Sequence, residues 1–141
     1  MKDLSNLKEI DLTDNSLEIF PYQLSSINSL QKINLSNNNI DEINSDIQYF
    51  TNLLELNMSG NFKSYERFIS DKIEMLTNLQ SLDLSNCSLY SSEIPKTLFN
   101  LYHLRYLNLS DNKLRYIPKN IENLTNLVTL NLAKNRIFGN R

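Results

Sequence analysis

The sequence of 141 residues carries a net charge of −2 and is 40% hydrophobic and 21% charged, which is typical of one globular domain and excludes a disordered chain. A single Cys and a single His exclude an internal disulfide framework and a zinc site. The balanced charge indicates neither nucleic acid nor a membrane as a partner, and no apolar run approaches the roughly 18 residues of a membrane-spanning helix.

Leu and Asn are unusually abundant, with 25 and 22 copies, and both recur in a tandem repeat. Its six rows are LKEIDLTDNSL (7–17), LQKINLSNNNI (30–40), LLELNMSGNFK (53–63), LQSLDLSNCSL (79–89), LRYLNLSDNKL (104–114) and LVTLNLAKNRI (127–137). Successive rows start 23, 23, 26, 25 and 23 residues apart. Repeats of this period indicate a solenoid, and they leave no room for a second domain.

Each row alternates apolar and polar residues at its centre, as in Ile10-Asp11-Leu12. A period of two predicts a strand with one buried face, and strands repeated in one direction pair in parallel. We predict an α/β solenoid, an arc with a short parallel β-sheet on its concave face and irregular or short helical segments on its convex face. The predicted coils span 7–29, 30–52, 53–78, 79–103, 104–126 and, in part, 127–141 of a single domain.

The ninth position of the rows predicts a structural ladder. It holds Asn15, Asn38, Asn61, Cys87, Asn112 and Asn135. A carboxamide both donates and accepts, so it can satisfy backbone groups where the chain leaves each strand. Cys87 has no adjacent base or cation that would activate a thiol, and we expect it to be structural. Asn108→Ala, on the strand surface, is expected to cost well under about 1 kcal/mol.

The third and fourth repeats are longer than the others. In the third, apolar and long side chains recur at helical spacing and predict a short helix over 62–76 on the convex side. The residues with this spacing are Tyr65, Phe68, Ile69, Lys72, Ile73 and Leu76. The segment is either a neutral surface insertion or a protrusion that contacts a partner through Tyr65, Arg67 and Phe68. Around Tyr90 the fourth repeat has two extra residues, which predict a slightly longer loop.

The rows resemble the leucine-rich repeat family, whose motif is L-x-x-L-x-L-x-x-N-x-L. The segments 17–27 and 114–124 are similar to the 23-residue intracellular class typified by Ras-group repeat proteins. The segment 92–104 is similar to repeats of plant receptor ectodomains, which leaves an extracellular location open. In this family the third, fifth and seventh positions of each row face the concave side, and the resemblance implies a protein partner.

The concave positions give the candidate site. The fifth position is always Asp or Asn, and the seventh is Ser or Thr except at Ala133. Tyr106 with Arg105 is the aromatic–cationic pair of this face, and such residues are typical binding anchors. We expect Arg105 and Lys134, on neighbouring coils, to hold a carboxylate. The candidate partner-binding residues are Lys32, Glu55, Arg105, Tyr106 and Lys134 on the concave side, with Tyr65 and Phe68 in the competing insertion.

Charge is distributed unevenly along the chain. Residues 1–60 hold three Lys and nine Asp or Glu, a net charge of −6, whereas residues 61–141 hold 11 Lys or Arg and seven Asp or Glu, a net charge of +4. In a solenoid this difference becomes a dipole along the axis. It is either an uneven solvated surface or a field that steers a charged protein partner.

No catalytic constellation, glycine-rich phosphate loop, metal site or cofactor site is evident. We predict a non-catalytic protein–protein interaction module. The alternatives are the recognition domain of a larger kinase or ubiquitin ligase, and an extracellular receptor ectodomain. The first residues contain no apolar core of a signal peptide, so we expect a cytoplasmic protein, or an extracellular one if a signal peptide precedes this sequence. Neither end has a polar cap, which indicates a piece of a longer protein or self-association through the ends.

Overall fold

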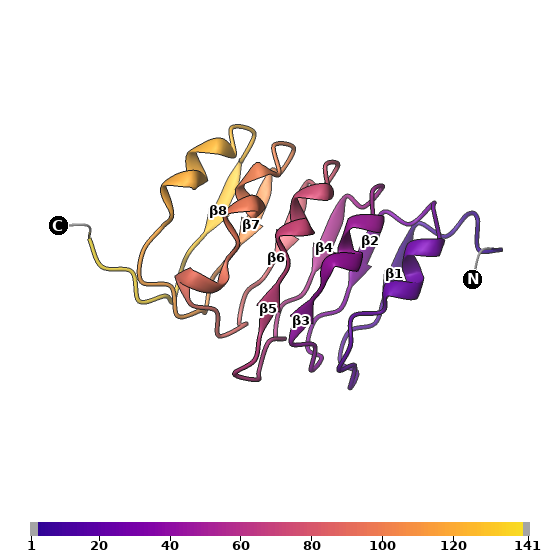
Figure 1. Ribbon diagram of the computed structural model, residues 1–141, viewed down its shortest axis with the longest axis horizontal. Helices are drawn as coiled ribbons and strands as arrows, with labels where there is room; N and C mark the ends of the chain where they lie inside the picture. The colour runs from indigo at the N-terminus through magenta and orange to yellow at the C-terminus, as the bar shows by residue number, and fades with distance from the viewer. Residues whose placement is uncertain (1–2, 140–141) are drawn as a thin grey trace.

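A computed structural model describes residues 3–139 and shows an arc-shaped solenoid with the chain ends at opposite ends of the arc (Figure 1). A parallel six-stranded sheet runs along one face in the order β1-β2-β4-β6-β7-β8. Its strands are β1 (Glu9–Asp11), β2 (Lys32–Asn34), β4 (Glu55–Asn57), β6 (Ser81–Asp83), β7 (Tyr106–Asn108) and β8 (Thr129–Asn131). The register joins equivalent residues of successive coils, such as Ile10 with Ile33 and Ile33 with Leu56. The predicted fold class is confirmed.

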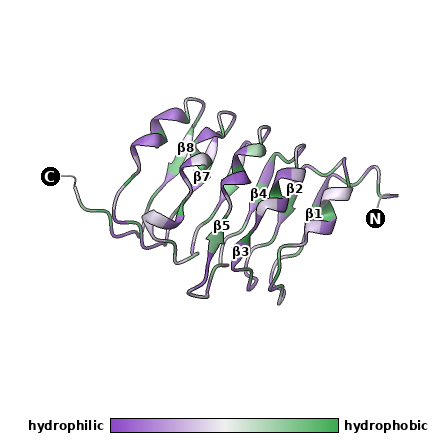
Figure 2. Cartoon of the chain, in the orientation of Figure 1, coloured by the Kyte–Doolittle hydropathy of each residue, from purple (hydrophilic) through white to green (hydrophobic). Residues whose placement is uncertain are grey.

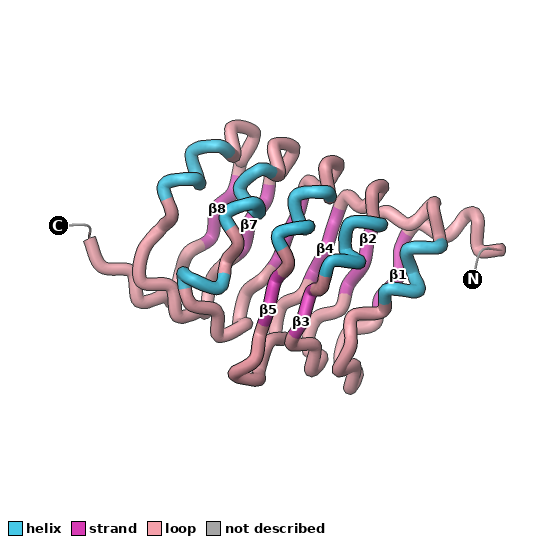
Figure 3. The backbone as a smooth tube through the Cα atoms, viewed as in Figure 1, coloured by secondary structure: helices cyan, strands magenta, loops and turns pink. Residues whose placement is uncertain are grey.

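Short 3-10 helices cover the opposite, convex side (Figure 3). They are η1 (Tyr22–Ser26), η2 (Ser45–Tyr49), η3 (Asp71–Met75), η4 (Ser91–Glu93), η5 (Lys96–Asn100) and η6 (Lys119–Asn123). Pro21, Pro95 and Pro118 immediately precede η1, η5 and η6, where a fixed φ and a missing N–H are no disadvantage. Asn44 and Ser70 instead cap η2 and η3 through their side chains.

The core lies between the sheet and the 3-10 helices. The central Leu or Ile of each strand of the large sheet lies between residues that are not hydrophobic, so the strands mix hydrophobic and hydrophilic colours in Figure 2, while the convex helices are mostly hydrophilic or neutral. Leu82 and Leu107 are fully buried, and burial of such a side chain contributes about 1.5–3 kcal/mol. The end coils are more open, since Leu130 is 38% exposed and Phe138 is 65% exposed.

The chain leaves every strand of the large sheet through a left-handed residue at the eighth position. These residues are Asp14, Asn37, Gly60, Asn86, Asp111 and Lys134, with φ between 53° and 72°. Asp, Asn and Gly tolerate this conformation best, which accounts for their prevalence at this position. At Gly60 a Cβ would lie 2.3 Å from Oδ1 of Asn37, so Gly60 also permits close packing of two coils.

The ninth-position asparagines bond neighbouring coils together. Nδ2 of Asn38 donates to the carbonyl of Leu12 (2.9 Å), while its Oδ1 accepts from the N–H of Leu17 (3.0 Å). Asn61 makes the same two bonds to the preceding coil, at 2.8 Å and 3.0 Å. Asn112 and Asn135 repeat the arrangement. Asn15, in the first coil, bonds only within its own turn and is exposed.

Cys87 makes half of these bonds. Its Sγ donates to the carbonyls of Met58 (3.4 Å) and Ser85 (3.2 Å), but a thiol offers only a weak acceptor. In the third coil, the backbone N–H of Lys63 therefore has no ladder oxygen to which it can donate, unlike the N–H of Ile40 in the second coil. The regular tenth-position bond is kept, since the N–H of Phe62 donates to the carbonyl of Ile40 (2.8 Å) as the N–H of Lys113 donates to that of Leu89 (2.8 Å). Phe62 adopts a left-handed φ of 56° and is fully buried, whereas Lys63 is exposed.

The predicted helix over 62–76 is wrong. The three extra residues lengthen the loop at 62–67, here called the insertion loop, in which Phe62 is buried and Tyr65 is exposed. The loop is followed by β5 (Phe68–Ile69) and η3. β5 pairs with β3 (Glu42–Ile43) in a two-stranded parallel sheet. The helical spacing arises because a strand and a 3-10 helix follow one another and bury Ile69, Ile73 and Leu76. The loop lies at the rim that follows the large-sheet strands, at the lower edge in Figure 1, and not on the convex side.

Removal of a ladder side chain should depend on the coil in which it lies. Asn38→Ala orphans buried backbone groups of two coils and is expected to lower the free energy of unfolding by about 1–3 kcal/mol. Asn15→Ala is the matched control and should cost less than about 1 kcal/mol, because Asn15 is exposed and bonds only within its own turn. Urea denaturation of the two variants checks this, and equal losses would contradict it.

The thiol of Cys87 should be inert in the folded protein. Burial raises the pKa of Cys87 from 9.0 to about 12, so the buried thiol stays protonated at neutral and mildly alkaline pH. Because the folded pKa is the higher one, this group's contribution to stability is present below pH 9.0 and is lost as pH rises towards 12. Iodoacetamide should label the native protein far more slowly than the protein in guanidinium chloride. Equal labelling rates would show that the thiol is accessible.

Candidate binding surfaces

The concave face carries the same hydrogen-bonded pair in every coil. The side-chain oxygen of the fifth residue accepts from the backbone N–H of the seventh. In coil five, Oδ1 of Asn108 also accepts from the hydroxyl of Ser110 at 2.7 Å. In coil one, the hydroxyl and N–H of Thr13 hold the pKa of Asp11 below its ordinary value. These Asx-type bonds end the strands locally, so the two positions leave little unused polar chemistry for a partner.

The expectation for Asn108 is corrected by these bonds. Asn108 is 9% exposed, accepts two bonds from Ser110 and donates to Oδ2 of Asp83 at 3.0 Å. Truncation of a buried polar group that leaves its partners unpaired costs about 1–3 kcal/mol. Asn108→Ala is therefore not a neutral surface change.

Lys32 and Glu55 belong to an intramolecular ion-pair triad on the concave face. The parallel register places Glu9, Lys32 and Glu55 side by side, and Nζ of Lys32 lies 3.3 Å from Glu9 and 3.2 Å from Glu55. Hydrogen bonds to Glu55 and then Glu9 raise the pKa of Lys32. Lys32 is thus paired within the protein. Among the third positions of the first three repeats there is no other cation to bind a partner.

Tyr106 and Arg105 lie together at the start of β7. Tyr106 is partly exposed on the strand, and Arg105, immediately before it, lines a cavity of about 320 Å³ with Gln80, His103 and Asn126. The ring of His103 bonds the carbonyl of Thr77 at 2.8 Å through Nδ1, so that nitrogen carries the proton. Arg105 has no ion-pair partner among residues 3–139. The cavity is a polar recess, and Arg105 in its lining directly precedes Tyr106, the one aromatic residue of the third-position row.

Lys134 does not join this recess. Lys134 follows β8, whereas Arg105 precedes β7, and the two strands are parallel neighbours. The two cations therefore lie at opposite rims of the sheet. The expectation that Arg105 and Lys134 share a carboxylate is wrong. The two residues lie on neighbouring coils, but one precedes its strand and the other follows its strand.

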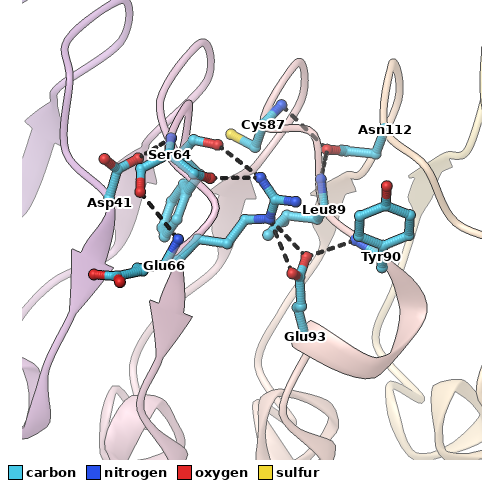
Figure 4. A network of polar contacts seen from close by, with 10 residues as sticks. Asp41, Ser64, Glu66, Cys87, Leu89, Tyr90, Glu93 and Asn112 are labelled. Atoms are coloured by element: carbon cyan, nitrogen blue, oxygen red, sulfur yellow. Dashed lines mark hydrogen bonds and ion pairs between the residues drawn. The ribbon is translucent and has the colours of Figure 1, made fainter.

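Arg67 fixes the insertion loop to the next coil. Its Nε lies 3.0 Å and 2.9 Å from the two carboxylate oxygens of Glu93, and its NH1 donates to the carbonyl of Ser64 at 2.7 Å. Figure 4 shows this network. The Arg67 side chain is only 4% exposed, and its guanidinium lies 5.5 Å from the ring centre of Tyr90. Arg67 is an anchor only if the insertion is a protrusion that contacts a partner, and its charge is instead paired with Glu93 inside the protein.

The two extra residues of the fourth coil complete this rim. The lengthened segment contains η4, and Glu93 in η4 also accepts from the N–H of Tyr90 at 2.8 Å. The buried hydroxyl of Ser91 accepts from the N–H of Arg115 at 3.0 Å and donates to the carbonyl of Tyr116 at 3.2 Å. Both longer repeats therefore meet in one network that spans coils three to five.

Tyr65 and Phe68, the two candidate residues of the insertion, remain exposed. Tyr65 is 95% exposed and Phe68 is 54% exposed. Their loop is held at several points, since the N–H of Ser64 donates to Asp41 at 2.9 Å and the N–H of Phe68 donates to the carbonyl of Asp41, also at 2.9 Å. The sequence missed the Arg67–Glu93 pair. The only sequence signal of this pair is that the two longer repeats, the third and the fourth, are adjacent.

Within residues 3–139 there is no group of three or more His, Cys, Asp or Glu placed to hold a metal ion. No helix in the same part of the chain is long and apolar enough to cross a membrane. The surfaces just described, the concave row around Tyr106 and the rim around the insertion loop, are therefore the candidate sites that the geometry offers.

The Arg67–Glu93 pair should contribute strongly to stability. Arg67→Ala leaves Glu93 without its cation and is expected to lower the free energy of unfolding by about 2–3 kcal/mol, less than the ~3–5 kcal/mol of a fully buried pair. The reduction reflects the 25% exposure of the Glu93 side chain. Arg115→Ala, at an exposed rim position, is the control and should change stability by less than about 0.5 kcal/mol. Thermal and urea unfolding measure both variants. An Arg67→Ala variant with an unchanged free energy of unfolding would disprove the stabilising role of the Arg67–Glu93 pair.

The comparisons with known proteins agree with this geometry. The family model described as Leucine rich repeat matches residues 1–40 and 77–137. A leucine-rich repeat protein of Leptospira interrogans is 35% identical with a TM-score of 0.83, over 97% of this chain and 34% of that protein. An internalin of Listeria monocytogenes, 24% identical, shares the fold with a TM-score of 0.75, over 95% of this chain and 36% of that one.

A third solved structure is the Arabidopsis receptor kinase HAESA in complex with the peptide hormone IDA and a co-receptor. The match is 30% identical with a TM-score of 0.78, and it covers 96% of this chain and 23% of that one. The chain thus spans about a third or less of the length of these solved proteins. No match was found among curated proteins. Because the family model covers more than half of the sequence and the solenoid has the matching architecture, the chain belongs to the leucine-rich repeat family.

Proposed function

We propose that this chain is a non-catalytic protein–protein interaction module that binds a polypeptide partner on its concave face around Tyr106. The observation that carries the proposal is the contrast along the third-position row. Coils one to three present an ion-pair triad. Coil five presents the large aromatic side chain of Tyr106, and the preceding residue, Arg105, lines a polar cavity and has no ion-pair partner among residues 3–139. A partly exposed Tyr offers a large rigid area with a polar tip at low entropic cost.

The chemistry of the recess indicates the partner's acidic group. The guanidinium of Arg105 has donors in a planar fork that matches a carboxylate, and the amides of Gln80 and Asn126 line the same cavity. The positive half of the chain, residues 61–141 with a net charge of +4, surrounds this end. A partner with an acidic segment would approach coils four to six first and be repelled by the acidic first coils.

A polypeptide partner is also supported by likeness. The Arabidopsis receptor kinase HAESA, 30% identical over the matched part, was solved with a peptide hormone and a co-receptor. The proposal includes two finer expectations. The repeat belongs to the 23-residue class, supported by the 23-residue spacing of three of the five row intervals, and the protein acts in the cytoplasm.

Peptides selected from a random display library on the immobilised chain test the proposal. Tyr106→Ala is expected to weaken binding of the selected peptides by about 2 kcal/mol or more, roughly 30-fold in Kd, as removal of a hot-spot residue does. The loss should appear mainly as faster dissociation. Tyr102→Ala is the matched control, because Tyr102 is 56% exposed in the loop before coil five, and it should leave binding unchanged.

Two outcomes would contradict the concave site. Peptides that bind Tyr106→Ala as tightly as wild type but lose binding to Tyr65→Ala would place recognition at the insertion loop. Recovery of no specific peptide, with the variants folded as judged by circular dichroism, would argue against a peptide-binding module altogether.

A further inference from the structure

We propose a second binding site, a cleft at the rim between the third and fourth coils that takes a basic side chain, Arg or Lys, of a protein partner. The proposal adds a site to the proposed protein-binding function and does not depend on the concave face. The cleft has a volume of about 320 Å³, which is at the low end of the ~300–1,000 Å³ of ligand pockets and suits one long side chain. The residues that give it chemical character are Arg67, Phe68, Ile69, Asp71, Glu93 and Pro95.

The floor of the cleft is apolar and preformed. Phe68 and Ile69 are adjacent in β5, so their side chains point to opposite faces. The side chain of Ile69 is buried in the core, whereas Phe68 is 54% exposed and offers the apolar side chain of this strand to a ligand. Pro95, which precedes η5, contributes the other apolar side. Backbone bonds at both ends of β5, Phe68 to Asp41 and Ser70 to Ile43, fix this strand. Because the strand is already ordered, little conformational entropy is lost when a partner contacts Phe68.

The charge of the cleft is negative. Its lining holds the carboxylates of Asp71 and Glu93 and the guanidinium of Arg67. Arg67 and Glu93 neutralise one another through two hydrogen bonds. Asp71 remains, exposed at the start of η3, with only a hydroxyl bond from Thr97 at 3.3 Å and no ion pair among the described residues. The net charge of the lining is thus −1.

A basic side chain fits an apolar floor with one free carboxylate. Arg and Lys bury their aliphatic stems on apolar surface while the charged head meets an acid, and an aromatic face such as Phe68 attracts a cation. The neighbouring cleft, of about 240 Å³ on the other side of η4, is lined by Arg115 and the tyrosines Tyr90 and Tyr116. Its cation disfavours a basic ligand, so the two clefts should differ in the charge that they accept.

The cleft exists because two irregular repeats meet. Its wall is η4, which lies in the lengthened segment of the fourth coil, and Arg67 from the insertion loop holds that wall through Glu93. In the second coil, the residue in register with Phe68 is the acidic Glu42. The site is therefore particular to this chain's third and fourth coils.

Proton–nitrogen correlation spectra of the full chain test the proposal, with two capped tripeptides as probes, Gly-Arg-Gly and Gly-Glu-Gly, at millimolar concentration. The Arg peptide should shift the amides of Phe68–Asp71 and Ser92–Glu93 and leave those of Arg115 and Tyr116 unchanged. Asp71→Asn should weaken its binding at least about tenfold, because a charge-assisted hydrogen bond is lost. Phe68→Ala should weaken it as well.

Asp46→Asn, in the equivalent helix η2, is the control and should bind the Arg peptide as wild type does. Equal shifts with the Glu peptide, or an Asp71→Asn variant that retains binding and native peak dispersion, would overturn the proposal. Peptides bound at the concave face are lost on Tyr106→Ala and not on Asp71→Asn, so failure of either site is distinguishable from failure of the other.

Discussion

Each coil of this solenoid must turn sharply out of its strand with backbone groups buried, and the hydrogen bonds that satisfy those groups hold the fold together. An unpaired buried N–H or carbonyl costs about 1–3 kcal/mol. The ninth-position carboxamide resolves two of them at once, as Asn61 does with Leu35 and Ile40 of the preceding coil. Because each bond joins successive coils, the ladder also fixes the stacking distance and the register of the sheet. The regular concave surface, with its closed Asx–Ser pairs, follows from that repetition.

The ladder is interrupted once, and the irregular surface lies at the interruption. Cys87 donates but does not accept in the way that Asn does, so the third coil is released from the common path after Asn61. Phe62 turns into the core with a left-handed backbone, and such strain costs about 1–3 kcal/mol. Arg67 then replaces the missing ladder bond with a different connection, to Glu93. Regular coils supply the scaffold, and the irregular pair supplies a cleft that a strict repeat would lack.

Much of this arrangement follows from the sequence, because strands, coil pitch and ladder depend on local periodicity. Contacts between coils do not follow from local periodicity. Ile69 and Ile73 are four residues apart, which is the spacing of one helical face, yet one lies in β5 and the other in η3. Arg67 and Glu93 are 26 residues apart, and nothing in either segment alone reveals the pair. Asn108 looked like a free surface residue because its bonds to Ser110 and Asp83 need the folded register.

Amide hydrogen exchange under native conditions tests the ladder account most directly. The N–H groups of Ile40 and Leu114 donate to the ladder oxygens of Asn61 and Asn135, and they should exchange slowly, with the global unfolding of the protein. The N–H of Lys63 faces a coil whose ladder residue is Cys87, and it should exchange at least about tenfold faster. Exchange of Lys63 as slow as that of Ile40 would contradict the claim that the ladder is broken at this point and that the irregular rim begins there.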